Sequence, residues 1–141
     1  VQSCAAEAQG ITVKEKSYGY EVILPHLMPK RNHRNHTVFL LEPLTYALKE
    51  FTAAHPICRL EYALIWFIYE YTEDTPIHCI RDYDNIETKE VLDIINSFFL
   101  LDDGGAFCEL HYSTRRGNRN GTRVIISSDI GLVSCQKING N

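Results

Sequence analysis

The spacing of apolar residues predicts two amphipathic helices in this chain. In both segments apolar side chains recur every three or four residues, so one face of each helix is expected to be buried. The first helix should open at Glu42-Pro43, where proline is well tolerated, and stop before His55-Pro56. The second should run from Asn85 to about Leu100. Its buried side should carry Thr88, Val91, Leu92, Ile95, Phe98 and Phe99.

Five further segments have the composition or alternation of β-strands. They are 11–13, 20–24, 60–69, 107–113 and 122–128. The first two should form a hairpin, with Tyr20, Val22 and Leu24 on its buried face. The third is apolar on both faces after its first few residues, which is typical of a strand at the centre of a sheet. The last two should pair as a second hairpin with an exposed tip at 114–121.

These elements and the composition predict one α+β domain. The chain has 141 residues, of which 45% are hydrophobic and 23% charged, so it can bury a core and is not expected to be disordered. We expect a small mixed β-sheet with two principal helices packed on it over residues 1–141, with weakly ordered ends at 1–10 and 130–141. The net charge of −4 argues against a basic nucleic-acid coat protein but allows local basic patches.

The cysteines and the apolar runs indicate a cytoplasmic protein. The five cysteines are scattered without a C-x-x-C pair, which favours reduced thiols over a disulfide framework. Cys108 and His111 have the spacing of metal ligands, but no second pair accompanies them, which argues against zinc. No apolar run reaches the roughly 18 residues of a membrane span, and the first residues lack a signal-peptide pattern. We therefore expect no membrane association.

An acidic segment precedes the second helix. Asp82 and Asp84 stand two apart where an extended segment gives way to the helix, so both carboxylates should project to one side. The helix then leads to a second acidic pair, Asp102-Asp103. Carboxylates held together repel unless a cation lies between them, and Mg²⁺ prefers oxygen ligands. The pattern predicts a site for Mg²⁺ (or Mn²⁺), to which Glu87 is also placed to add an oxygen.

Each acidic feature also has a simpler interpretation. Asp84 or Asn85 could cap the helix, and Asp102-Asp103 could form a polar turn. Glu87 could merely suit the positive end of the helix dipole. The occurrence of both acidic pairs at the two ends of one amphipathic helix favours the metal interpretation.

Two basic segments could hold a phosphate backbone. One is the polar loop before the first helix, and the other is the tip of the second expected hairpin. Solvated loops are the alternative for both. The candidate DNA-binding residues are Lys30, Arg31, Arg34, Arg115, Arg116 and Arg119.

The motif Arg81-Asp82-Tyr83-Asp84-Asn85, followed by a helix and Leu101-Asp102-Asp103, resembles the RusA family. These proteins are small, dimeric, Mg²⁺-dependent Holliday junction resolvases of DNA recombination and repair, often carried on mobile elements. The resemblance covers roughly residues 20–128, and its specific part is the short acidic motif. It implies an endonuclease that cleaves branched DNA as a homodimer. Its implied metal-binding catalytic carboxylates are Asp82, Asp84 and Asp103, helped by Glu87 or Asp102.

One position departs from the family pattern. The family's lysine would fall at Thr88, whereas Lys89 follows one residue later, about 100° around the helix. There it should pair with Asp93 on the outer face. Two hypotheses follow. Lys89 supplies the catalytic cation of an active endonuclease, or the chain is a catalytically weak or inactive RusA-like module that binds DNA or a protein.

Overall fold

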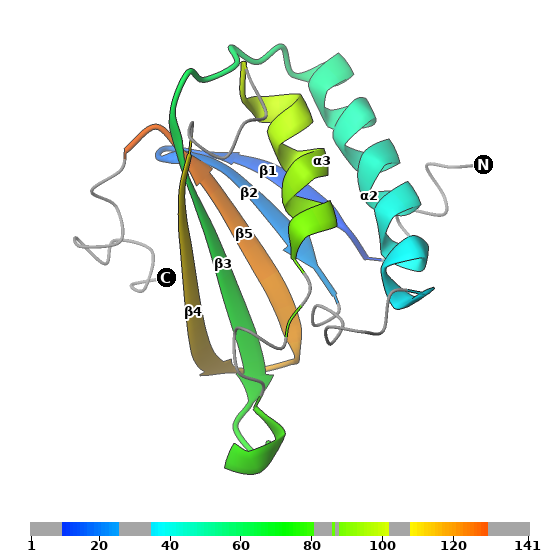
Figure 1. The fold of residues 1–141 in the computed structure, drawn as a ribbon, viewed down its shortest axis with the longest axis vertical. Coiled ribbons are helices and arrows are strands. Elements are labelled where there is room, and N and C mark those ends of the chain that lie inside the picture. Colours follow the sequence, from blue (N-terminus) through cyan, green and yellow to red (C-terminus); the bar gives the residue numbers. More distant parts are fainter. Residues whose placement is uncertain (1–9, 26–34, 81–85, 87, 102–107, 130–141) are drawn as a thin grey trace.

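The structure, a computed structural model, has one mixed β-sheet with two helices on one face (Figure 1). It describes residues 10–25, 35–80, 86, 88–101 and 108–129, with only the backbone for 35–39. The strands are β1 (Thr12–Lys16), β2 (Gly19–Leu24), β3 (Ala63–Thr72), β4 (Cys108–Gly117) and β5 (Gly121–Ser127). The helices are α2 (Asn35–Ala54) and α3 (Lys89–Phe99), with a short 3₁₀ helix at Ile77–Cys79. The predicted α+β class is confirmed.

The sheet has the strand order β1-β2-β5-β3-β4. β3 and β4 are parallel and are joined through α3, since parallel neighbours need a long crossover connection. The other pairs are antiparallel. β3 is buried from Ala63 to Tyr69 and lies between two strands, so its predicted central position is confirmed.

β4 and β5 do not form the predicted hairpin. β3 lies between them, so that Tyr69 faces Thr114 of β4 on one side and Thr122 of β5 on the other. The short link from Gly117 to Gly121 crosses the end of β3 instead (Figure 1). The physical reason is that β3 is apolar on both faces. When β3 lies between two strands, the backbone groups on both of its edges are hydrogen-bonded and both of its faces stay buried.

β1 and β2 form the predicted hairpin. Val22 and Leu24 are fully buried and Tyr20 packs against the same core, as expected. Gly19 has φ of 145°, a conformation that favours glycine. A Cβ atom at this position would overlap the backbone carbonyl oxygen of Ile126 in β5. Glycine therefore allows β2 to approach β5 directly after the turn.

α2 begins seven residues before the predicted Glu42 and contains Pro43 in its interior. Leu40, Leu44 and Leu48 follow one another at a spacing of four, and all three are buried. Burial of Leu40 against the sheet extends the helix beyond proline, although an internal proline removes one helical hydrogen bond. The predicted end at Ala54 is confirmed.

α3 begins at Lys89, four residues after the predicted Asn85, which lies outside the described residues. Thr88 precedes the helix, and its hydroxyl lies 3.1 Å from the Tyr112 hydroxyl instead of capping the helix. The predicted buried side is confirmed: Val91, Ile95 and Phe99 are buried against the sheet, and Leu92 and Phe98 pack on the core.

Candidate functional site

The face of the sheet turned away from α2 and α3 carries a second, smaller apolar cluster. Leu64, Trp66 and Ile68 alternate along β3 with the residues that face the helices, and Ile125 of β5 joins them. All four are at most 4% exposed, and Tyr18 packs against them. We call this surface the helix-free face. The charged residues of the helix-free face lie around the apolar cluster and provide the ion pairs of this face.

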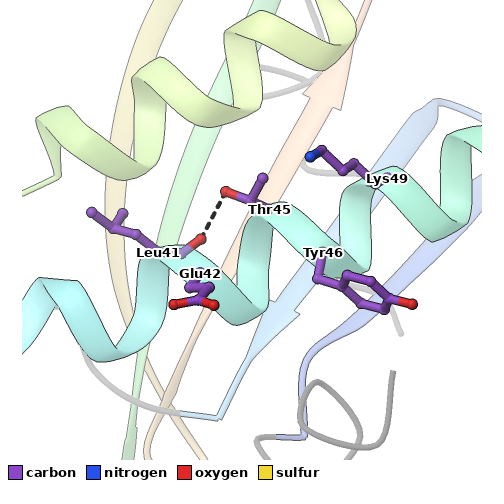
Figure 2. Close-up of a pocket in the computed structure, with 5 residues that line it drawn as sticks. All are labelled: Leu41, Glu42, Thr45, Tyr46 and Lys49. Carbon is purple, nitrogen blue, oxygen red and sulfur yellow. Dashed lines mark hydrogen bonds between the residues drawn. The ribbon is translucent and has the colours of Figure 1, made fainter. Parts of the chain in front are cut away.

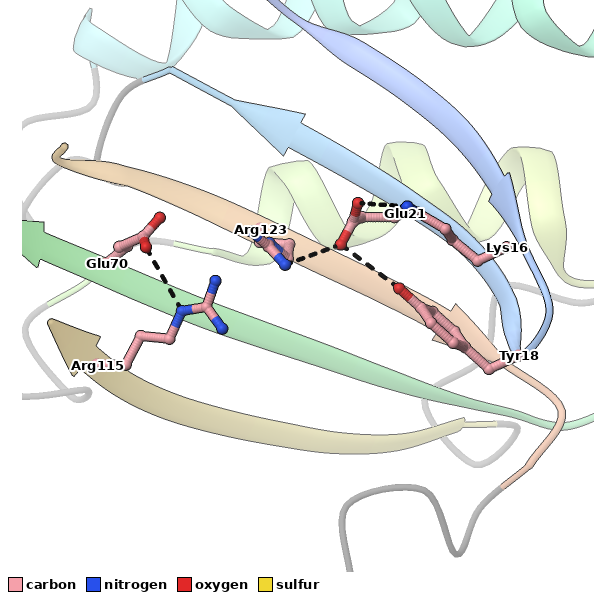
Figure 3. A network of polar contacts seen from close by, with 6 residues as sticks. All are labelled: Lys16, Tyr18, Glu21, Glu70, Arg115 and Arg123. Atoms are coloured by element: carbon pink, nitrogen blue, oxygen red, sulfur yellow. Dashed lines mark hydrogen bonds and ion pairs between the residues drawn. The ribbon is translucent and has the colours of Figure 1, made fainter. Parts of the chain in front are cut away.

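Glu21 is the most buried charged group on the helix-free face, at 3% exposure. Its carboxylate lies 3.2 Å from Nη1 of Arg123 and 3.9 Å from Nζ of Lys16, and it accepts a 3.4 Å hydrogen bond from the Tyr18 hydroxyl (Figure 3). A buried carboxylate requires such partners, because removal from water penalises an unpaired charge. In the sequence, Glu21 stands between the core-facing residues Tyr20 and Val22, which is a signal for its place on the opposite face, whereas no local pattern indicates its partner Arg123.

Burial, and next the negative charge of Glu21, raise the pKa of Tyr18 to about 12 from its ordinary value of 10. The folded state thus holds this proton more tightly than the unfolded state. The contribution of Tyr18 to stability is complete below pH 10 and is lost as the pH rises through about 12. In an ultraviolet phenolate titration, we expect Tyr18→Phe to remove one late ionisation step. Tyr62→Phe, which removes an exposed phenol, should leave that step in place; loss of the same step in both variants would contradict the environment of Tyr18.

Two hollows meet at Glu70 on the helix-free face. The first, of about 380 Å³, is called the hairpin hollow here and is lined by Ile23, Leu24, Glu70, Asn118, Arg119, Gly121, Thr122 and Arg123. The second, of about 590 Å³, is lined by Trp66, Ile68, Glu70, Ser113, Thr114, Arg115 and Arg116. Oε2 of Glu70 lies 3.6 Å from Nε of Arg115, an ion pair that is too long for a hydrogen bond (Figure 3). Arginines thus stand on both sides of one carboxylate.

The link between β4 and β5 is tied to the end of β3. The Arg116 guanidinium donates to the carbonyl oxygens of Thr72 (2.9 Å) and Thr75 (2.6 Å). The Thr72 N–H donates to Oδ1 of Asn120 at 3.0 Å. The prediction that Arg115 and Arg116 project from an exposed hairpin tip is therefore wrong, because β4 extends to Gly117 and both side chains are half-buried. Arg119 is exposed at the tip, as predicted.

Most of the predicted metal and DNA-binding residues lie outside the described residues. These are Asp82, Asp84, Glu87, Asp102, Asp103, Lys30, Arg31 and Arg34. Lys89 is exposed on α3 and pairs with Asp93 at 3.0 Å, so its predicted outward orientation is confirmed. In the part of the chain that the structure describes, no group of three or more His, Cys, Asp or Glu residues could hold a metal ion. Binding of Mg²⁺ or Mn²⁺ by the acidic motif stays a prediction.

A hollow of about 300 Å³ lies on α2 and is lined by Leu41, Glu42, Thr45, Tyr46 and Lys49 (Figure 2). All five residues come from one helix. The Thr45 hydroxyl donates to the Leu41 carbonyl at 2.8 Å, so its hydrogen bond is made within the helix itself. The side chains diverge along the helix and do not converge on one point. This surface is therefore a weaker candidate than the hairpin hollow.

The chain belongs to the family DUF6100, a family of unknown function, whose match covers residues 1–130. No curated protein matches it. Solved structures that match include two of the periplasmic domain of Helicobacter pylori MotB. One has 14% identity and a TM-score of 0.45 and covers 94% of this chain and 86% of the MotB chain. The other has 15% identity and a TM-score of 0.43 and covers 92% of this chain and 96% of the MotB chain. These values carry no inference about function.

The family match corrects the resemblance to RusA. The family model that matches residues 1–130 is DUF6100. The predicted Mg²⁺-dependent endonuclease of branched DNA, its role in recombination and repair, and the alternative of an inactive RusA-like module are therefore wrong. The physical reason is that a few aspartates beside a helix also suit caps and turns, so such a short motif is weakly specific.

Two further predictions concern membrane-spanning helices and the state of the cysteine thiols. No helix among the described residues is long and apolar enough to span a membrane. Cys58, Cys79 and Cys108 are free thiols in the structure, and Cys4 and Cys135 lie outside the described residues. Burial raises the pKa of the Cys108 thiol, while a hydrogen bond from Asn96 opposes this rise. The cytoplasmic location stays a prediction.

Proposed function

We propose that this domain binds a small anionic ligand, bearing a phosphate or carboxylate group, in the hairpin hollow. The observation that supports the proposal is the presence of two arginines, Arg119 and Arg123, in one hollow of about 380 Å³. This volume is in the range of small-molecule sites. Guanidinium groups hold phosphate and carboxylate through paired, charge-assisted hydrogen bonds.

The charge balance of the hollow favours an anion. Its carboxylate, Glu70, is already paired with Arg115, and Glu21 is paired with Arg123 and Lys16. Arg119 is exposed and makes no ion pair with the other described residues. The chain as a whole has a net charge of −4, so this concentration of arginines is local. A local positive potential attracts anions even on an acidic protein.

The wall of the hollow is organised before a ligand arrives. Asn120 and Arg116 fix the link that carries Arg119 to the end of β3 through three hydrogen bonds. Arg123 lies on β5, and its contact with Glu21 orients it. A site held in place loses less conformational entropy on binding. Asn118 adds an amide that can donate to a bound oxygen.

Calorimetric titration of the whole chain with pyrophosphate, and separately with citrate, tests this proposal. We expect binding by one or both anions, and a loss of about ten- to a hundredfold in affinity for Arg119→Ala, since hydrogen bonds to charged groups are worth about 1.5–3 kcal/mol. The two anions distinguish phosphate from carboxylate chemistry.

Arg59→Ala is the matched control. Arg59 is an exposed arginine before β3 and is absent from the lining of the hairpin hollow. Its removal changes the net charge equally and should leave the affinity unchanged. Failure of both anions to bind, or an equal loss in the two variants, would contradict the site.

A further inference from the structure

We propose that two copies of this chain pair through β4 and form a dimer with one continuous sheet. β4 ends the described sheet, where it is paired with β3 along one edge. Its ten residues place a long row of backbone N–H and C=O groups on the other edge. Such an edge accepts another strand through main-chain hydrogen bonds. This surface is separate from the hairpin hollow and does not depend on its ligand.

The opposite end of the sheet is protected against such pairing. β1 has five residues, half the length of β4, and contains Lys14 and Lys16. It also lies beside α2. Short, lysine-bearing edge strands discourage further pairing. β4 contains no lysine, and its Leu110 is 39% exposed. The partner strand is thus expected at β4.

Charge favours one register for two antiparallel copies of β4. In a two-fold dimer, one position lies on the axis, and residues at equal distances on either side face each other. With Tyr112 on the axis, Glu109 of each copy faces Arg115 of the other, and opposite charges across a strand pair attract. An axis at Ser113 would set His111 against Arg115, and an axis at His111 would set Glu109 against Ser113. Neither shift pairs opposite charges.

Both charged groups remain accessible for this contact. The Glu109 side chain is 36% exposed and the Arg115 side chain 29%. Glu109 contacts His111 at 3.0 Å, which leaves its second carboxylate oxygen available. Nε of Arg115 is buried without a hydrogen-bond partner, and its ion pair with Glu70 is loose at 3.6 Å. A second carboxylate from another copy would complete the environment of Arg115.

Sedimentation equilibrium of the whole chain tests the dimer. We expect a monomer–dimer equilibrium that Glu109→Lys weakens at least about tenfold, because two symmetric attractive pairs become repulsive. Glu90→Lys makes the same change of charge at an exposed position on α3 and should leave the dissociation constant unchanged. A monomer at every concentration, or an equal effect of both substitutions, would overturn the proposal.

A photochemical cross-link tests the register. The exposed Leu110 is replaced by p-benzoylphenylalanine, which should link on irradiation to the region of Thr114 in the second copy. Mass spectrometry locates the link. Cross-links outside β4 would overturn this interface. A chain that stays monomeric while an added extended peptide protects the β4 amides from exchange would assign the edge to another protein, and would equally overturn the dimer.

Discussion

Gly19→Ala is expected to lower the free energy of unfolding by about 3 kcal/mol or more, because it combines backbone strain with a steric clash. Gly19 has φ of 145°, where a residue with a side chain is strained. The new Cβ atom would also overlap the Ile126 carbonyl oxygen in the neighbouring strand. Relief requires β2 and β5 to separate, which would disturb the centre of the sheet. Urea denaturation followed by circular dichroism measures the change.

Gly10→Ala separates the strain from the clash. Gly10 also has a positive φ, of 75°, but a Cβ atom there would meet only the Pro25 side chain at 3.4 Å. We expect this control to cost about 1 kcal/mol, the typical cost of a left-handed conformation. Equal costs for the two substitutions would show that β2 does not approach β5 at Gly19.

The second large effect is expected for Phe67→Ala, at about 3–5 kcal/mol. Phe67 has 0% exposure at the middle of β3, where its ring lies 6.3 Å from that of Tyr69 and 5.9 Å from that of Tyr112, measured between centroids. Truncation leaves a cavity between the sheet and the helices, since strands fixed on both sides cannot move in to fill it. Chemical denaturation of the purified variant gives the value directly.

Tyr62→Ala is the control for Phe67→Ala. Tyr62 is 44% exposed and directly precedes β3, so its removal should change the free energy of unfolding by less than about 0.5 kcal/mol. A similar loss in both variants would mean that the start of β3 is packed as tightly as its centre. A small loss in Phe67→Ala would contradict the central position of the strand.

The chain alone determined the local elements and their buried sides. The alternation in 20–24 placed Val22 and Leu24 in the core, and the helical spacing placed Val91, Ile95 and Phe99 against the sheet. The continuous apolar run of β3 identified the central strand. Such patterns are readable because the burial of a side chain follows the period of its own helix or strand. The Lys89–Asp93 pair followed from the same periodicity.

Only the tertiary structure decided which strands are neighbours and which charges meet. Pairing between strands depends on residues far apart in the chain, and the parallel pair β3–β4 displaced the predicted hairpin of β4 with β5. For the same reason Arg115 and Arg116 became half-buried, while Arg119 and Arg123 came to line one hollow. Local pattern records which face of an element is apolar, but contacts between elements arise from packing over long sequence separations. These contacts define both the hairpin hollow and the position of β4 at the end of the described sheet.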